Sequence, residues 1–435
     1  MMEQVLLSDV VETANTGLDA IRRAPIVNFE TDIRCLRIQD ISQNKDISHW
    51  GFTEVKPQDW EKYQLIKDDI IMARTCSTGI SFLVRQNMNA VFNNGLLRIR
   101  VKKDKVLPEY IYYVFKSQNF ANYIDGISGG TSVQLNMKIG DVLKYPLFIP
   151  SFDIQDKIVK QLSVLDKKIQ LNTETNQTLE AIAQAIFKHW FIDFAPVHAK
   201  ANALANGQTT EQAELAAMAS ISGKNIEQIH ALAKENSPAY EQLKQTAAAF
   251  PSEFVESELG KIPKGWEIDG ISNVCRVVYG KGLPKNKLKL SGYPVYGANG
   301  VIGYHDTYLY KDRQVLIGCR GTVGKVSVSA PFSFITSNSL IVEYSNSSLN
   351  LFFLENYLKN IDLSIFSSGS VQPQITIQNL SKLKVLIPSK NILDIFDMTV
   401  KHQYFYIYKN TDETYYLSEI RDTLLPKLLN GEIEL

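Results

Sequence analysis

Ser132-Val-Gln-Leu-Asn-Met-Lys-Ile139 and Ser370-Val-Gln-Pro-Gln-Ile-Thr-Ile377 are two copies of one short motif in this chain of 435 residues. The alignment continues without a gap to Pro150 and Pro388, and seven of its nineteen positions are identical. The same offset of 238 residues carries a weaker similarity through about 40 further positions. An internal repeat of this length predicts two structurally similar modules.

Each copy of the motif leads into a long amphipathic segment. Asp153 and Asn391 follow the aligned prolines and are residue types that commonly cap the start of a helix. Beyond them, apolar residues recur at steps of three and four, as in a coiled-coil seam. These residues are Ile154, Ile158, Leu162, Leu165 and Ile169 in the first copy and Ile392, Phe396, Val400 and Ile407 in the second. We predict one helix that runs to about Phe191 and another that kinks at Pro426 and stops near Gly431.

The segments upstream of both helices have the composition of short strands. Val- and Ile-rich runs broken by Gly, Asn and Ser indicate β-rich modules at residues 1–150 and 265–388. Residues 151–264 are expected to form a helical spacer followed by an Ala/Gln-rich helical insert and a linker, and residues 389–435 a C-terminal spacer helix. The sequence therefore predicts an α+β fold, in which two β-rich domains related by the repeat are separated by long antiparallel coiled-coil helices.

Composition narrows the class of protein. Hydrophobic residues make up 45% and charged residues 21%, as in soluble globular proteins. No apolar run is long enough to span a membrane, and the N-terminus lacks the pattern of a signal peptide. The four cysteines have neither CxxC spacing nor a nearby histidine pattern, which favours reduced thiols over a zinc site or disulfides. We expect a cytoplasmic protein.

The formal net charge is zero, but the charge is unevenly distributed. Residues 265–388 hold 12 Lys/Arg against 7 Asp/Glu, whereas residues 1–150 hold 18 against 17. The two helical segments are acidic, with 11 Lys/Arg against 14 Asp/Glu in residues 151–264 and 5 against 8 in residues 389–435. This pattern suits a polyanion bound to the modules and a protein bound to the helices.

Motifs for catalysis or metal binding are missing from the sequence. Gly297-Ala-Asn-Gly-Val-Ile-Gly303 has no amphipathic helix after it, as a dinucleotide loop would require. Gly318-Cys-Arg-Gly-Thr-Val-Gly-Lys325 lacks the glycine–lysine spacing of a phosphate loop and is better read as a tight β-turn. The chain also has no Pro-Pro-aromatic loop of an amino-methyltransferase. We therefore expect no catalytic residue, no metal ligand and no cofactor on this chain.

Basic, aromatic and amide residues are interleaved in both β-rich modules. Lys and Arg neutralise phosphates, and Arg, Asn and Gln can read base edges. The predicted DNA-binding residues are Arg74, Arg98, Arg100, Lys102, Lys103 and Gln134 in the first module and Lys281, Lys285, Lys287, Lys289, Tyr296, Asn299, Tyr304, Arg320, Lys325 and Gln372 in the second. Arg74 matches Arg320 in this comparison, and Arg320 and Asn299 are the predicted base contacts. A charge run on either module alone is more often a solvated face.

These residues resemble a known family, the specificity subunit of type I restriction–modification enzymes. The resemblance rests on Tyr293–His305, Val315–Lys325, Gln184–Phe194, Glu258–Trp266 and Arg421–Gly431 together with the repeat. The first module matches less well, since it has Arg74-Thr-Cys-Ser-Thr-Gly79 where the second has the Arg-Gly-Thr turn.

The resemblance implies two target-recognition domains that each read half of a split, asymmetric DNA site. It implies two methyltransferase subunits docked on the helices and restriction/motor subunits in the full complex, with S-adenosylmethionine on the methyltransferase. Expected partner contacts are the apolar residues of the two helical motifs, Phe187, Trp190, Phe191, Leu424, Leu425 and Leu428. Two alternatives stay open at this point: a duplicated DNA-binding regulator without enzyme partners, and an enzyme with an unrecognised site.

Overall fold

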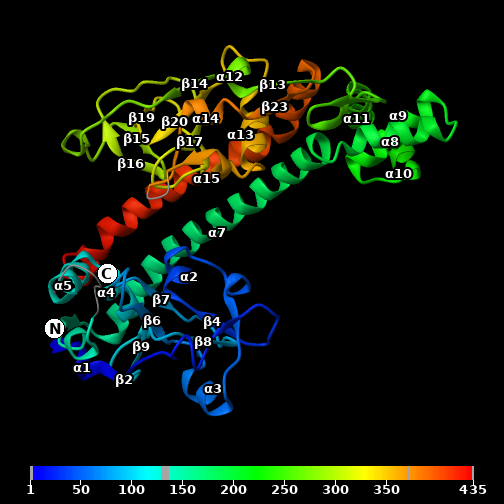
Figure 1. The fold of residues 1–435 in the computed structure, drawn as a ribbon. Coiled ribbons are helices and arrows are strands. Elements are labelled where there is room, and N and C mark those ends of the chain that lie inside the picture. The colour runs from blue at the N-terminus through cyan, green and yellow to red at the C-terminus, as the bar shows by residue number, and fades with distance from the viewer. Residues whose placement is uncertain (1–2, 129–136, 370–371, 434–435) are drawn as a thin grey trace. The chain divides into compact units, whose positions relative to one another are not determined.

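The chain forms two compact units, which we describe separately. The computed structural model describes residues 3–128, 137–369 and 372–433 (Figure 1). Unit 1 consists of Met1–Glu174 and Asn410–Leu435, and unit 2 of Thr175–Lys409. The two boundaries lie inside the long helices α7 (Phe152–Phe191) and α15 (Lys390–Leu429).

Unit 1 contains a mixed β-rich module. Its strands are β1 (Glu3–Leu6), β2 (Val11–Thr16), β3 (Ile26–Val27), β4 (Arg34–Leu36), β5 (Gly51–Thr53), β6 (Ile70–Ala73), β7 (Ser81–Leu83), β8 (Ala90–Phe92), β9 (Leu96–Val101) and β10 (Pro146–Ile149). Its short helices are α1 (Leu7–Val10), α2 (Ile38–Ser42), η1 (Ile47–His49), α3 (Pro57–Tyr63), α4 (Pro108–Phe115), α5 (Gln118–Ser128) and α6 (Ile139–Val142).

Two four-stranded sheets and a strand pair organise this module. The first sheet is antiparallel with order β2-β9-β6-β7, the second has order β3-β5-β4-β8, and β1 pairs with β10. Strand β6 contributes side chains to two hydrophobic cores, because successive side chains of a strand point to opposite faces of the sheet. Ile70 and Met72 enter the core shared with α4 and the ends of the long helices. Ile71 and Ala73 enter the core on the other face of β6, which also contains residues of β4 and β8.

Unit 2 contains a second module of the same design. Its strands are β11 (Phe254–Ser257), β12 (Gly260–Pro263), β13 (Glu267–Gly270), β14 (Arg276–Tyr279), β15 (Tyr293–Gly297), β16 (Gly300–His305), β17 (Val315–Gly318), β18 (Val326–Val328), β19 (Phe334–Ile335), β20 (Ser339–Glu343), β21 (Ser367–Ser368), β22 (Gln374–Ile375) and β23 (Lys384–Ile387). Its short helices are α12 (Ile271–Val274), η2 (Lys285–Lys287), α13 (Leu351–Lys359), η3 (Leu363–Phe366) and α14 (Ile377–Leu380).

The two modules share the framework of their sheets. The antiparallel sheet of unit 2 has the order β14-β20-β17-β18, the same topology as β2-β9-β6-β7. Strand β15 pairs in parallel with β19, as β4 does with β8. Strand β17 repeats the alternation of β6, with Val315 and Ile317 in one core and Leu316 in another. The predicted α+β fold with a duplicated β-rich module is therefore confirmed.

The long helices run antiparallel to each other within each unit. In unit 1, Asp166 pairs with Arg421 at 3.0 Å, and Lys168, further along α7, pairs with Glu413, earlier on α15, at 3.1 Å. In unit 2, the Asn176 amide donates to the Ile407 carbonyl at 3.1 Å, and the Phe187 and Phe396 rings lie 5.9 Å apart. The order of these contacts agrees with the predicted pairing.

Two details of the helix prediction are wrong. Helix α7 begins at Phe152 and α15 at Lys390, so Asp153 and Asn391 lie in the first turn and are not N-caps. The apolar pattern also belongs largely to the module cores: Ile158 and Leu162 lie in a cluster with residues of α4. From Asp166 to Asn176, ion pairs and hydrogen bonds join α7 to α15. Helix α15 continues through Pro426 and ends at Leu429, two residues before Gly431.

Four further helices follow α7 in unit 2. They are α8 (Ala195–Ala205), α9 (Thr210–Ser222), α10 (Ile226–Glu235) and α11 (Ser237–Ala249). Their small core contains Ala217, Met218, Ile229 and Ala247. Among the described residues, no helix is long and apolar enough to cross a membrane.

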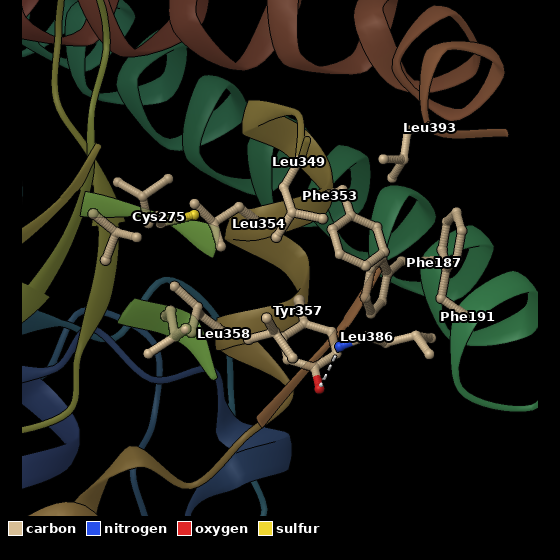
Figure 2. Packing of buried hydrophobic residues seen from close by; sticks show 14 of the residues in the cluster. Phe187, Phe191, Cys275, Leu349, Phe353, Leu354, Tyr357, Leu358, Leu386 and Leu393 are labelled. Atoms are coloured by element: carbon tan, nitrogen blue, oxygen red, sulfur yellow. Dashed lines mark hydrogen bonds between the residues drawn. The ribbon is translucent and has the colours of Figure 1, made fainter. Parts of the chain in front are cut away.

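The main core of unit 2 joins the module to both long helices (Figure 2). Phe187 and Phe191 of α7 face Phe353 of α13, with ring centroids 5.4 Å and 5.0 Å away. The Tyr357 hydroxyl accepts a hydrogen bond from the Leu386 backbone N–H at 3.3 Å, which ties α13 to β23. Aromatic packing of this kind fixes how the module sits on its own segments of helix.

Candidate nucleic-acid interface

Three segments of the second module converge at one place. The β15–β16 hairpin tip, the β17–β18 turn and strand β22 all approach Gly318 or Cys319. A Cβ added at Gly318 would lie 2.2 Å from the Thr322 carbonyl oxygen and 3.2 Å from that of Ala298. The Ile375 N–H donates to the Cys319 carbonyl at 3.1 Å. Because only glycine fits at position 318, the turn and the hairpin tip can pack this closely.

Exposed polar side chains project from these segments. The Nε of Arg320 donates to Oε1 of Gln374 at 3.2 Å, and Nζ of Lys325 donates to Oδ1 of Asn299 at 2.5 Å. Arg320, Lys325 and Asn299 are exposed, and Gln374 is half-buried. The structure thus brings together three of the predicted DNA-binding residues. The sequence analysis missed Gln374, although this residue lies in the same Gln-Pro-Gln segment as the predicted Gln372. The Gln372 side chain is exposed.

The neighbouring cysteine is an anchor and not a reactive group. The Cys319 side chain is 1% exposed and packs in the main core of unit 2. Burial raises the pKa of the Cys319 thiol, although the nearby positive charge of Arg320 opposes that shift. The thiol therefore stays neutral. Residue 319 holds the turn to the core while residue 320 points outward.

The four predicted phosphate-binding lysines lie on the loop between β14 and β15, and all are exposed. Lys289 forms an ion pair with Asp306, and this hydrogen bond lowers the pKa of the Asp306 carboxyl. In the part of the chain that the structure describes, Lys281, Lys285 and Lys287 have no carboxylate partner. Their ammonium groups are therefore available to a polyanion.

The two predicted tyrosines have structural contacts. The Tyr296 side chain is half-buried, and its hydroxyl accepts from the Ala330 N–H at 2.9 Å. Tyr304 pairs through its backbone with Lys289 at 2.9 Å, and its side chain is half-buried. Both tyrosines therefore support the loops that carry the basic residues.

The basic cluster of the first module is largely engaged within the fold. Arg98 is 4% exposed, and its guanidinium donates to the carbonyls of Lys62 and Gln64 and to the Asn15 amide oxygen. Burial lowers the pKa of Arg98, and the charge of Asp69 opposes that shift. The prediction that Arg98 contacts DNA is wrong, because a buried side chain with these partners cannot reach a phosphate.

Three other basic residues of this cluster also have partners. Arg100 forms a two-pronged ion pair with Asp69, with bonds of 2.5 and 3.2 Å. Nζ of Lys103 contacts Asp68 at 2.5 Å, and Nζ of Lys102 donates to the Asp9 carbonyl at 3.1 Å. Lys103 is exposed, so its surface pair can exchange for a phosphate at little cost. Gln134 lies outside the described residues.

The backbone register corrects the match between Arg74 and Arg320. The Met137 N–H donates to the Arg74 carbonyl, and the Ile375 N–H donates to the Cys319 carbonyl. Met137 and Ile375 are equivalent in the repeat, which makes Arg74 the counterpart of Cys319. The counterpart of Arg320 is then Thr75, the next residue. Arg74 stays a predicted DNA contact on its own account.

The predicted partner contacts are mostly buried within their own units. Phe187, Phe191 and Trp190 are at most 3% exposed and lie in the main core of unit 2. Leu425 and Leu428 are 4% and 1% exposed and lie in the unit 1 core, where the half-buried Leu424 packs beside them. The prediction that the five buried side chains contact a partner is therefore wrong, because they hold the helices to the modules. For the half-buried Leu424 the partner contact stays a prediction.

Comparisons with known proteins identify the family. The family model for the type I restriction modification DNA specificity domain matches residues 2–181 and 263–404. The chain is 33% identical to the type I restriction enzyme HindI specificity subunit of Haemophilus influenzae, over 91% of this chain and 93% of that protein. It is 26% identical to the MjaIX specificity subunit of Methanocaldococcus jannaschii, over 79% of this chain and 73% of that protein.

A solved structure has the same fold. The type I restriction–modification S subunit from M. genitalium matches with a TM-score of 0.53 and 16% sequence identity, over 99% of this chain and 96% of that one. The sequence relatives favour the specificity-subunit interpretation over the stand-alone regulator. With its duplicated β-rich module and these matches, the chain belongs to the family of type I restriction–modification DNA specificity subunits.

Proposed function

We propose that this chain reads a bipartite, asymmetric DNA site, one half-site with each module, and carries no catalytic group of its own. The observation that supports this most is a duplicated framework with different loops. The antiparallel sheets of the two modules share one strand order, yet the exposed Arg320 of the second turn is replaced by Thr75 in the first. Two modules with similar sheets but different exposed side chains on their loops are suited to read two different half-sites.

The proposal includes partners that supply the chemistry. Two adenine methyltransferase subunits dock on the helices and bind S-adenosylmethionine, and restriction/motor subunits join the full complex in the cytoplasm. We assign docking to exposed apolar side chains on α15 and not to the buried aromatics of α7. In unit 2 these are Met398, Phe405 and Tyr406, and in unit 1 Tyr415, Tyr416 and Ile420, each 40–64% exposed. Exposed apolar groups gathered on a helix commonly mark a protein interface.

The experiment that tests this function maps methylated bases in cells that carry the complete system, with and without this chain. The proposal expects a split motif whose methylation needs this chain. It also expects that the purified chain alone transfers no methyl group and cuts no DNA. Methyl transfer by the isolated chain, or a methylation pattern that does not change when the chain is removed, would refute the proposal.

A further inference from the structure

We propose that Arg320 recognises a guanine in the half-site of the second module and that Gln374 positions its guanidinium for that contact. The inference rests on the proposed DNA-reading function and adds the residues and the base. Gln374 Oε1 accepts from Arg320 Nε at 3.2 Å. Arg320 is exposed, and its two terminal Nη groups form a fork that can donate to O6 and N7 of guanine in the major groove.

The scaffold under this pair is rigid. Cys319 and Ile375 are each 1% exposed, and the Ile375 N–H donates to the Cys319 carbonyl at 3.1 Å. The Cys319 N–H in turn donates to the Asn338 carbonyl at 2.9 Å. Arg320 and Gln374 are the chain neighbours of these buried residues, so their backbones are fixed next to each other. A base-reading side chain needs such support, since small displacements weaken a bidentate contact.

The lack of charge on Gln374 supports the proposed contact between Arg320 and guanine. Arg100 in unit 1 shows what a carboxylate does, because Asp69 binds both its Nε and its Nη2. Gln374 offers Arg320 one acceptor and no charge, and among the described residues Arg320 has no carboxylate partner. The full positive charge and both Nη groups of Arg320 therefore stay available to DNA.

The neighbouring pair has a different role. Lys325 and Asn299 lie on the same group of loops, with Asn299 Oδ1 already accepting from Lys325. An amide whose oxygen holds a lysine is less suited to a bidentate contact with adenine, which requires both the oxygen and the nitrogen of the amide. The ammonium of Lys325 instead suits a phosphate next to the guanine. The first module has Thr75 in place of Arg320, so the guanine preference concerns one half-site.

The test uses the complete methyltransferase complex and DNA with randomised half-sites. Arg320→Lys keeps the charge and loses the fork, so guanine should lose about 5- to 150-fold of its preference at one position. Gln374→Leu should reduce the preference at that same position by about 5-fold, as expected for one lost hydrogen bond. Gln374→Glu should not restore the preference, because a carboxylate would bind both Nε and Nη2 of Arg320, as Asp69 binds those of Arg100. Gln378→Leu, a change at an exposed glutamine four residues away, is the matched control and should leave it intact.

The outcomes separate this inference from the proposed function. Three results would overturn the role of Arg320. They are an unchanged split motif in Arg320→Lys, a loss of methylation in this variant that is equal for all sequences, and a half-site of the second module that contains no guanine. A normal preference in Gln374→Leu, or a change in Gln378→Leu equal to it, would overturn the positioning role. None of these outcomes refutes the proposed function, which would instead be contradicted by a native complex that methylates no split motif. The unaltered half-site read by the first module reports that each variant is folded.

Discussion

The guanidinium groups of Arg98 and Arg320 lie in opposite environments. Arg98 is 4% exposed and bound by backbone carbonyls, whereas Arg320 is exposed and held through one nitrogen by a neutral amide. Sequence reasoning gave both residues the same role, because a basic cluster on a strand does not reveal which side chains face inward. In β9 the alternation places Arg98 on the face of the core that contains Leu96. Burial, not charge, decides which basic groups reach DNA.

At this scale, Lys287 should act as a phosphate contact. Replacing it with alanine removes one exposed ammonium that has no carboxylate partner among the described residues. The slope of log affinity against log salt should fall by about 0.9, and all sequences should be weakened to a similar degree. Filter binding or anisotropy at several salt concentrations measures this with the assembled complex. Lys244→Ala, on the helical insert, is the control; an identical slope for the two variants would argue against the contact.

Asp397 should make stability depend on pH. Burial raises the pKa of its carboxyl to about 7, with Lys390 opposing the shift, and its Oδ1 has no hydrogen-bond partner. Since the folded-state pKa lies above the unfolded value, the free energy of unfolding falls as pH rises from about 4 to about 7, and the penalty persists above that range. Asp397→Asn removes the penalty, so this variant should be more stable than the native chain above pH 7, by about 1 kcal/mol after solvent screening.

Urea unfolding between pH 6 and 8.5 measures this difference. The matched control for Asp397→Asn is Asp394→Asn. The hydrogen bond from Lys390 lowers the pKa of the Asp394 carboxyl, so removing the negative charge of Asp394 should not stabilise the chain. A difference between Asp397→Asn and the native chain that stays constant over this pH range would contradict the account.

At the scale of elements, the long helices were predictable and their faces were not. Apolar residues at steps of three and four identified α7 and α15 almost to their ends. The same spacing is compatible with packing against a partner helix, a module or a second chain. It therefore did not predict which of these surfaces Phe187 contacts. The answer depends on Phe353 and Phe396, which are more than 160 residues away in sequence and reach Phe187 only in the folded unit. The polar contacts of Asp166 and Asn172 were hidden for the same reason.

The exposed face of α15 should carry the methyltransferase contact in unit 2. Phe405 is 59% exposed, so Phe405→Ser should leave the fold intact and reduce co-purification of the methyltransferase subunit by tenfold or more, as for an aromatic interface anchor worth about 1.4 kcal/mol or more. Phe187→Ala is the contrasting variant. Phe187 is fully buried, and its loss should cost about 3–5 kcal/mol of stability. Normal co-purification of a folded Phe405→Ser chain would exclude this face as the contact.

The length of the helices should set the gap between the half-sites. Both α7 and α15 cross the unit boundary, after Glu174 and Lys409 respectively. Four residues inserted at both places add about 6 Å and a rotation of about 400°, close to a full turn. Methylation mapping on targets with graded gaps should then show a gap one or two base pairs longer, with both half-site sequences unchanged.

A two-residue insertion is the control for this experiment. It rotates each helix by about 200° and turns the packed face away, so the variant should fail to assemble. An active four-residue variant with an unaltered gap, or with altered half-sites, would show that the helices do not determine the spacing.

For the whole molecule, the repeat was the strongest signal in the sequence. The gapless match after residue 132 predicted two equivalent modules, and the strand orders bear this out. Upstream of that match, loops of different length change the offset, which is why Arg74 was paired with Arg320 instead of Cys319. Hydrogen bonds from Met137 and Ile375 were needed to find the register. Framework residues repeat because both modules pack in the same way, whereas reading loops differ between them.

The central claim is that each module reads its own half of a split site. The most direct measurement is a methylation map of cells that carry the complete system, with either the native chain or a chain whose residues 320–325 are replaced by residues 75–80 of the first module. We expect the native chain to give two half-sites across a fixed gap, and the exchanged chain to alter one half-site while the other half-site and the gap stay the same. A change in both half-sites, or a continuous motif without a gap, would contradict the account.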